Sequence, residues 1–506
     1  MFSDFVRDRP RLVILLLAII STVPLMSPSL PPLTDLLGHI GRYRVQLDLA
    51  SDPVLQRYYG FEWALIGNLG VDLLVQVIAP LIGLESAVKL IVIAIVALTT
   101  GGFLLLAYQA HGRISAAAIF ALPLAYSFPF QFGFVNYCLS MALAFLAFAL
   151  WLWLGHSGRI RLRLILFVPI SFGIWLAHIS GWGALGLFAF AGDYTRLRQA
   201  GKAHLMAAGE SILQCLPLAL PVAIMVLIGR ADTDGGTGVW FDWETKYQWF
   251  AMALSEQWQP FDIISVTILL FVIAVAAILS DMKFDKALGL ATLLLFIAFI
   301  IIPRILIGSA YADMRLAPFV LAMALLAIDT RQLSNSGLWR GIMVLGLAFF
   351  LIRTATTAYN FRNHDAMIRR ELGALNKIPV GARVASFITY SCRSQWQLDR
   401  RTHLPSIALA RRRIFTNDQF IMNGAQLIQI RYKAGFPFDR DPTQLIKSDK
   451  CDRPDLLTFA QSMAKLPRSG FDFIWIIGAP EDTQVDYNGL TRIWRNGTSV
   501  VYRIEH

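Results

Sequence analysis

Residues 89–108 read KLIVIAIVALTTGGFLLLAY, and only the lysine that opens this stretch is charged. The stretch has the roughly 20 residues that an α-helix needs to cross the hydrocarbon core of a bilayer. Similar stretches recur along the chain, among them RLVILLLAIISTVPLM (11–26) and MALAFLAFALWLWLG (141–155). Of the 506 residues, 56% are apolar and 16% are charged, whereas soluble domains carry roughly 25% charged residues. The sequence therefore predicts an α-helical polytopic membrane protein.

The apolar stretches stop near residue 357, and ordinary globular sequence follows. We expect a transmembrane domain over 1–358, with a large outer loop at 30–87, and a soluble α/β domain over 359–506. In the soluble domain, ARVASFITY, FDFIWIIGA and TRIWRNGTSVVYRIE are typical of strands, and HLPSIALARRRIF of a helix. Asn496-Gly497 lies between two β-rich arms and predicts a two-residue hairpin turn.

The net charge of +11 does not indicate a nucleic-acid partner, because most Lys and Arg residues lie in short loops between apolar stretches. Such loops face the cytoplasm. We expect about eleven membrane-spanning helices, with the N-terminus in the cytoplasm and the soluble domain in the periplasm of a bacterial inner membrane. The stretch 71–83 is too short to span and is expected to lie on the outer surface as an interfacial helix. The expected spans are approximately 11–29, 88–108, 114–130, 135–155, 162–178, 179–193, 206–229, 261–280, 286–305, 314–330 and 339–357.

The four cysteines divide into two pairs. Cys138 and Cys215 lie within apolar stretches, where a cysteine is usually inert. Cys392 and Cys451 both fall in the soluble domain, and an even pair in an oxidising compartment predicts a disulfide between them.

Directly after the first apolar stretch comes PPLTDLLGHIGRYRVQ (31–46). Asp35, His39 and Arg42 are four and three residues apart, so on a helix they share one face, and Thr34 is expected to be the N-cap. Arg can hold a phosphate, Asp can accept a proton from a hydroxyl, and His can donate or orient. The alternative is that the helix dipole alone favours Asp35 and that Arg42 only touches lipid phosphate.

The predicted topology places further polar side chains on the same side of the membrane, while the bilayer midplane is almost empty of ionisable groups. Such an asymmetry favours chemistry at the outer surface over transport through the middle. His178 is either a packing residue or a substrate contact, and Arg315 either pairs with Asp313 or faces a phosphate. The expected contacts of an acceptor or a mobile loop are Tyr59, Trp63, Asn136, Trp240 and Asp242. An interfacial aromatic belt would equally explain the tryptophans.

This arrangement resembles the GT-C class of integral membrane glycosyltransferases. The resemblance rests on TDLLGHIGR (34–42) after the first span, with Asp35 in the position of the catalytic acid, and on YYGFEWALIGNLGVDLL (58–74) as the horizontal segment. Several families of this class carry a tight acidic pair here, whereas this chain has one acid, with Asp48 and Asp52 further along. A role for a divalent cation such as Mg²⁺ or Mn²⁺ is therefore left open.

The resemblance implies that a sugar passes from a polyprenyl-phosphate carrier to a lipid, polysaccharide or protein acceptor, with inversion at the anomeric carbon. Asp35 would be the base, and His39, Arg42, His178 and Arg315 would bind the phosphate and sugar of the donor. Membrane lipids would surround the body of the protein. Two alternatives remain: a flippase or exporter of lipid-linked sugars, and a non-catalytic subunit of a machine that assembles envelope polysaccharide.

Overall fold

A computed structural model describes residues 8–228, 236–306, 308–333, 337–390, 396–422, 424, 426–447, 451, 453–479 and 487–506. The chain folds into two compact units, which are considered one at a time. The helical unit comprises Met1–Ser27, Leu65–Val71 and Leu90–Tyr359. The mixed unit comprises Pro28–Ala64, Asp72–Lys89 and Asn360–His506. The predicted domain boundary at residue 358 thus lies beside the observed one, but most of the loop 30–87 belongs with the C-terminal residues.

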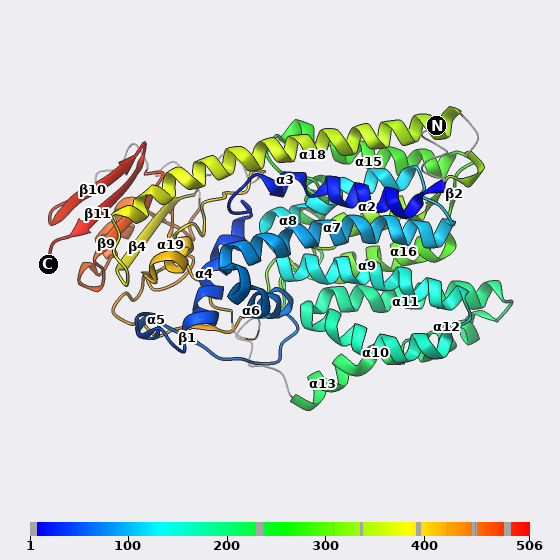
Figure 1. The fold of residues 1–506 in the computed structure, drawn as a ribbon, viewed down its shortest axis with the longest axis horizontal. Coiled ribbons are helices and arrows are strands. Elements are labelled where there is room, and N and C mark those ends of the chain that lie inside the picture. Colours follow the sequence, from blue (N-terminus) through cyan, green and yellow to red (C-terminus); the bar gives the residue numbers. More distant parts are fainter. Residues whose placement is uncertain are drawn as a thin grey trace. The chain divides into compact units, whose positions relative to one another are not determined.

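In the helical unit, long helices run beside one another, and α11 packs against both α9 and α16 (Figure 1). Two short strands, β2 (Lys283–Phe284) and β3 (Ile328–Asp329), pair antiparallel. Its helices are α2 (Pro10–Ser21), α3 (Val23–Met26), most of α7 (Leu84–His111), α8 (Phe128–Phe132), α9 (Val135–His156), α10 (Ile160–Ala177), α11 (Ile179–Gln199), α12 (His204–Gln214), α13 (Leu220–Ile228), α14 (Trp243–Ala251), α15 (Gln259–Ile278), α16 (Lys286–Ile301), α17 (Ala317–Ala327) and the first part of α18 (Gly337–Glu371). Short 3-10 helices cover Ala117–Tyr126, Leu216–Ala219 and Arg331–Leu333.

Five helices in the described residues are long and apolar enough to cross a membrane: Leu84–His111, Val135–His156, Ile160–Ala177, Gln259–Ile278 and Gly337–Asn376. A sixth candidate is the pair His204–Gln214 and Leu216–Leu227, which is bent by 50°. These helices support a membrane protein, while the number of eleven crossings stays a prediction. The expected spans at 11–29, 114–130, 286–305 and 314–330 contain only shorter helices or 3-10 turns.

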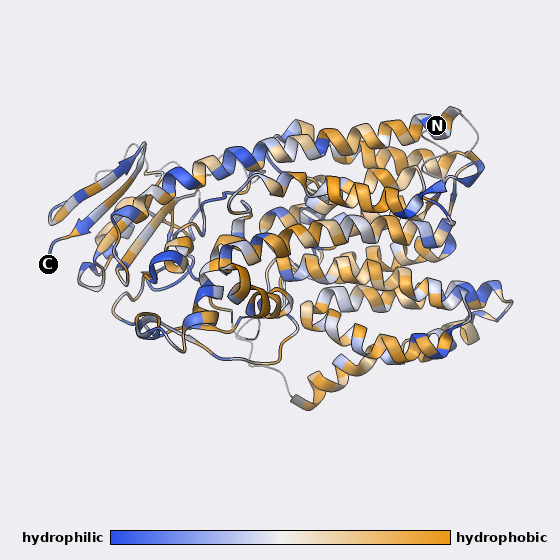
Figure 2. Cartoon of the chain, in the orientation of Figure 1, coloured by the Kyte–Doolittle hydropathy of each residue, from blue (hydrophilic) through white to orange (hydrophobic). Residues whose placement is uncertain are grey.

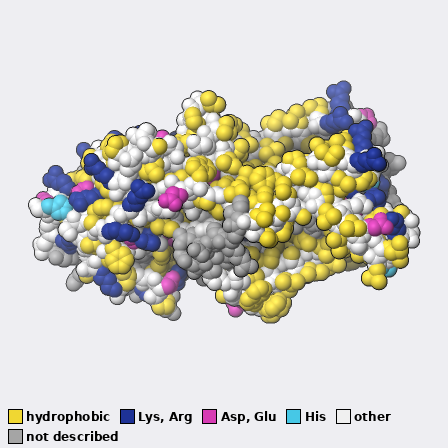
Figure 3. All heavy atoms as spheres, turned by 90° about the horizontal axis from the view of Figure 1, so that it is seen from below, with side chains coloured by type: hydrophobic (Ala, Val, Ile, Leu, Met, Phe, Trp, Pro, Cys, Tyr) yellow, Lys and Arg dark blue, Asp and Glu magenta, His cyan; other side chains and the backbone are white. Residues whose placement is uncertain are grey.

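The outside of the helical unit is apolar. Hydrophobic residues colour its helices along most of their length in Figure 2, and hydrophobic side chains cover most of its surface in Figure 3. Large side chains such as Ile165, Phe271 and Leu345 are more than half exposed. A surface of this kind buries its apolar area against lipid rather than against protein.

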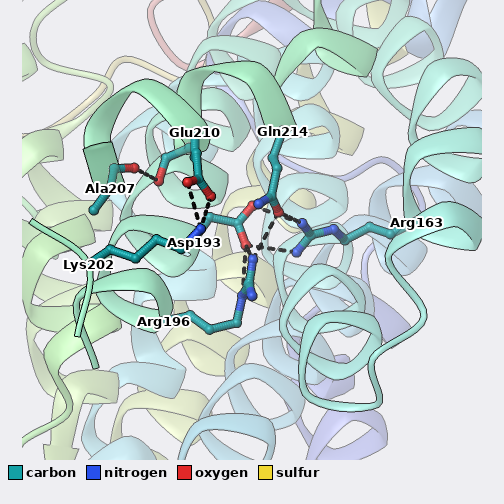
Figure 4. Close-up of polar contacts among 8 residues, drawn as sticks. Arg163, Asp193, Arg196, Lys202, Ala207, Glu210 and Gln214 are labelled. Carbon is teal, nitrogen blue, oxygen red and sulfur yellow. Dashed lines mark hydrogen bonds and ion pairs between the residues drawn. The ribbon is translucent and has the colours of Figure 1, made fainter. Parts of the chain in front are cut away.

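Not all charges of the helical unit lie on its surface. Arg163 on α10 is buried and donates two hydrogen bonds, of 3.0 and 2.9 Å, to the carboxylate of Asp193 on α11. Arg196 donates to the same carboxylate at 3.0 Å, and both arginines donate to Oε1 of Gln214 on α12. Figure 4 shows these side chains converging from three helices. The cluster ties α10, α11 and α12 together.

The mixed unit contains a seven-stranded sheet in the order β10-β11-β9-β4-β7-β8, with β5 pairing with β4. Strand β4 is parallel to β5, β7 and β9, whereas β11 is antiparallel to both β9 and β10. The strands are β4 (Arg383–Thr389), β5 (Phe415–Thr416), β7 (Leu445–Lys447), β8 (Leu457–Thr458), β9 (Phe473–Ile477), β10 (Leu490–Asn496) and β11 (Ser499–Ile504). All of β9 and the middle of β4 are buried, which forms the core of this unit.

The remaining elements of the mixed unit come from both ends of the sequence. Strand β1 (Tyr59–Phe61) pairs antiparallel with β6 (Ile428–Ile430), so the loop after the first apolar stretch is hydrogen-bonded to C-terminal residues. The helices are α4 (Thr34–Asp48), α5 (Pro53–Tyr58), α6 (Gly70–Ile82, from Asp72 on), α19 (Pro405–Arg412) and α20 (Phe459–Lys465), with 3-10 turns at Leu372–Asn376 and Arg468–Gly470. The predicted strands, the Asn496-Gly497 hairpin and the predicted helix are confirmed.

Candidate functional site

The predicted face of Asp35, His39 and Arg42 lies on α4, in the mixed unit. This helix forms because Leu36, Leu37 and Ile40 supply an apolar side that is completely buried. It begins at Thr34, so Leu33 is the N-cap instead of the predicted Thr34, and no side chain caps the helix. Asp35 stands in the first turn, where the helix dipole favours a carboxylate.

Two glycines let other parts of the mixed unit approach α4 closely. A Cβ at Gly41 would lie 2.9 Å from the backbone oxygen of Ser406 on α19. A Cβ at Gly38 would lie 3.0 Å from the ring of Phe420 and 3.2 Å from His403. Larger residues would therefore push α19 and the segment at 418–420 away from the predicted catalytic face.

His403 is the nearest titratable partner that the structure gives Asp35. Its Nε2 lies 3.8 Å from Oδ1 of Asp35, whose side chain is 17% exposed, and the His403 side chain is 6% exposed. Nδ1 of His403 lies 2.9 Å from the backbone carbonyl oxygen of Asp418. Because a carbonyl oxygen can only accept, Nδ1 must carry a proton, and Nε2 is the nitrogen that gains or loses one.

Charge favours the protonated form of His403. Burial opposes a charge on this ring, but the carboxylates of Asp441, Asp35 and Asp418 outweigh burial, and the pKa of His403 is raised. An imidazolium beside a carboxylate stabilises the ionised carboxylate. Asp35 is therefore held as a carboxylate that is partly open to solvent, which is the state that a proton acceptor needs.

His39 lies one turn further along α4 and has the opposite electrostatic character. Burial first, and then Arg42 and His403, lower the pKa of His39, so its imidazole is neutral. Its ring meets Phe420 edge-on at 5.4 Å. Within the described residues, its buried Nδ1 and the buried Oγ1 of Thr34 have no hydrogen-bond partner. A buried polar atom without a partner is uncommon, and a ligand is one explanation.

Arg42 is committed to a neighbour within the mixed unit. Its guanidinium forms a short, buried ion pair with Asp72 on α6, and it lies over the ring of Tyr43. Gln46, one turn later, donates a 2.9 Å hydrogen bond to the backbone oxygen of Asp72. The inner face of α6 is thus fastened to α4, and much of the charge of Arg42 is already neutralised.

Tyr59 and Trp63, two of the predicted acceptor contacts, differ in exposure. Tyr59 is completely buried, stacks on Phe415, and its hydroxyl accepts a 3.1 Å hydrogen bond from the backbone N–H of Thr416. Trp63 is half exposed, and its ring lies 5.2 Å from that of Phe61. Trp63 is the one of the two that a second molecule could reach.

In the helical unit, the structure brings two predicted residues together. His178 separates α10 from α11, and its Nδ1 accepts a 3.1 Å hydrogen bond from the backbone N–H of Ser180. The ring proton therefore lies on Nε2, and this atom is 3.4 Å from Nη1 of Arg315. Two donors thus face each other, and an acceptor such as a phosphate oxygen could accept from both.

Asp313 does not pair with Arg315, the alternative that the sequence left open. Its carboxylate accepts hydrogen bonds from Nζ of Lys246 at 3.1 Å and from Nε1 of Trp249 at 3.2 Å. Arg315 instead lies over the ring of Phe134 and donates to Ser309.

The other predicted contacts of the helical unit have local structural roles. Asn136 accepts a hydrogen bond from the N–H of Val71 and donates one to the carbonyl oxygen of Asn68, which fixes segment 65–71 on α9. Asp242 is the N-cap of α14, accepting from the N–H of Thr245, and lies 3.8 Å from Arg304. Trp240 is half exposed.

Two predictions concern covalent and metal chemistry. Cys392 lies outside the described residues, so its disulfide with Cys451 stays a prediction. The described residues contain no group of three or more His, Cys, Asp and Glu side chains that could hold a metal ion. The divalent cation left open by the resemblance thus finds no such ligand set there, and no step below depends on one.

Sequence reasoning missed His403 and the partnership of Asp72 with Arg42. His403 comes two residues before Pro405, the first residue of α19, and no local spacing connects it with Asp35. The glycines at 38 and 41, on the face of α4 that meets α19, were the available signal for a close helix contact. No family model, curated protein or solved structure matches the chain.

Proposed function

We propose that the chain is a membrane glycosyltransferase that moves a sugar from a polyprenyl-phosphate carrier to an acceptor on the outer side of a bacterial inner membrane. The observation that carries this proposal is the partly exposed carboxylate of Asp35 against the buried imidazole of His403. A carboxylate in this setting suits a general base at neutral pH.

In the proposed reaction, the acceptor hydroxyl attacks the anomeric carbon of the sugar while Asp35 takes the hydroxyl proton. The bond between that carbon and the phosphate oxygen breaks, its electron pair leaves with the polyprenyl phosphate, and the sugar is inverted. His403 acts as a positioning residue, because its imidazolium holds Asp35 ionised. His39 is neutral and offers Nδ1 to a hydroxyl of a bound ligand.

The phosphate of the donor requires hydrogen-bond donors and positive charge, since negative charge grows on the leaving oxygen. Arg315 and Nε2–H of His178 are two donors at one place in the helical unit. We therefore keep this pair as the proposed phosphate contact. Arg42 is a weaker candidate, because Asp72 already neutralises it.

The test compares Asp35→Asn with Asp48→Asn, the same substitution near the other end of the same helix. Asp48 is 28% exposed and pairs with Arg44. Each purified protein is given a panel of polyprenyl-phosphate hexoses and pentoses, and the release of free polyprenyl phosphate is measured. Loss of a general base lowers the rate by about 10²–10⁴-fold. We expect that loss in Asp35→Asn and near-normal release in Asp48→Asn.

The outcome separates the three hypotheses of function. Release that persists in folded Asp35→Asn within about tenfold of the wild type would remove Asp35 as the base. Movement of the intact lipid-linked sugar across liposomes, with no release of phosphate, would favour a flippase. Absence of both activities in the wild type, across the whole panel, would favour a non-catalytic subunit.

A further inference from the structure

The mixed unit carries a groove that has no part in the proposed chemistry at Asp35. Its volume is about 630 Å³, within the range of pockets that bind small molecules. It is lined by the end of the 3-10 turn at 372–376, by α19 and by β9, β10 and β11, through Asn376, Lys377, Ile378, Pro379, Arg412, Phe473, Ile493 and Arg503. Three of these eight residues are cationic and none is acidic.

The three cations differ from most of their neighbours in having no printed carboxylate partner. Arg411 pairs with Glu85 at 2.7 Å, and Arg413 pairs with Asp52 at 2.8 Å. Arg412, between them, forms no ion pair within the described part of the chain, and the same is true of Lys377 and Arg503. The groove therefore combines uncompensated positive charge with an apolar floor of Ile378, Phe473 and Ile493.

We propose that this groove binds an acidic oligosaccharide, a class of acceptor for the proposed transfer. Guanidinium groups bind carboxylates and phosphates with two parallel hydrogen bonds, and Lys377 adds a mobile point charge. The C–H faces of sugar rings are apolar and match the floor of the groove. The inference deepens the proposed function and rests on it for the identity of the ligand as an acceptor, while binding itself can be measured without transfer.

The test is isothermal titration of the purified full-length chain with three probes. Hexagalacturonate supplies an acidic hexasaccharide, maltohexaose supplies a neutral one of the same length, and inorganic pyrophosphate supplies charge without sugar rings. The variants are Arg412→Gln and Arg503→Gln. The matched control is Arg492→Gln, an exposed arginine on β10 that does not line the groove.

We expect hexagalacturonate to bind at least about tenfold more tightly than either other probe, and each groove variant to weaken that binding about tenfold. Arg492→Gln should leave it unchanged, and added salt should weaken it because the charges are solvent-accessible. Equal binding of both hexasaccharides, or unchanged affinity in Arg412→Gln and Arg503→Gln, would overturn the proposal. Tight pyrophosphate binding with weak hexagalacturonate binding would also overturn it, in favour of a simple anion site.

The two proposals fail separately. Hexagalacturonate binding that survives in Asp35→Asn supports the groove whatever the outcome of the transfer assay. Transfer that needs Asp35, without any binding of the acidic probe, would leave the glycosyltransferase standing and remove the groove.

Discussion

The buried pair of Arg42 and Asp72 gives a prediction whose size follows from the structure. The two side chains are 4% and 0% exposed. Removing one partner of such a pair leaves the other charge buried without compensation, at a cost of about 3–5 kcal/mol. We therefore expect Asp72→Asn to destabilise the mixed unit by this amount, although the amide has nearly the shape of the carboxylate.

That cost corresponds to a large thermal shift. For a unit of about 200 residues, 1 kcal/mol lowers Tm by about 2–4 °C, so Asp72→Asn should lower Tm by roughly 6–20 °C. The control is again Asp48→Asn, whose ion pair with Arg44 is 25–28% exposed. An exposed pair contributes about 0–1 kcal/mol, so its loss should cost less than about 4 °C.

The measurement is thermal unfolding of the detergent-solubilised protein, together with hydrogen exchange of the peptides that cover α4 and α6. The double variant Arg42→Met with Asp72→Leu should recover most of the stability, because neither charge remains buried. Equal, small shifts for Asp72→Asn and Asp48→Asn, or a double variant no better than the single ones, would refute this reasoning. If the double variant is stable but no longer binds a polyprenyl-phosphate donor, Arg42 also contacts the phosphate.

Two further predictions concern His403 and the contact between α9 and α11. The folded-state pKa of His403 is raised, so the ring contributes stability below its ordinary pKa of about 6.5 and loses that contribution as pH rises through the raised value. The difference in Tm between the wild type and His403→Gln should shrink from pH 5 to pH 9, and a difference that grows would contradict the assignment. A Cβ at Gly181 would lie 2.5 Å from the backbone of Ser140, whereas a Cβ at Gly183 meets nothing within 4 Å. Gly181→Ala should therefore lower Tm, and Gly183→Ala should not; equal effects would show that α11 shifts to make room.

The sequence predicted those elements whose cause is local. The hairpin of β10 and β11 follows from Asn496-Gly497 between β-rich arms, and α4 from apolar residues that recur with the helical period. The placement of Asp35, His39 and Arg42 on one helix could be predicted for the same reason.

The partners of these residues could not be predicted, because they come from distant parts of the chain. His403 meets Asp35 only because α19 packs on the glycines of α4, and Asp72 meets Arg42 only once α6 folds back. Arg163 shows the limit of counting charges. It contributed to the basic loop GHSGRIRLR, which was assigned to the cytoplasm, yet it is buried on α10 against Asp193.

This last pair has a consequence for biogenesis. An arginine or an aspartate alone in a helix costs about 2.5–3.5 kcal/mol when it enters the hydrocarbon from the translocon. Arg163 and Asp193 sit on successive helices joined only by His178, so neither is neutralised until both helices have left the ribosome. The two helices are therefore expected to partition into lipid together, as a preassembled hairpin rather than one after the other.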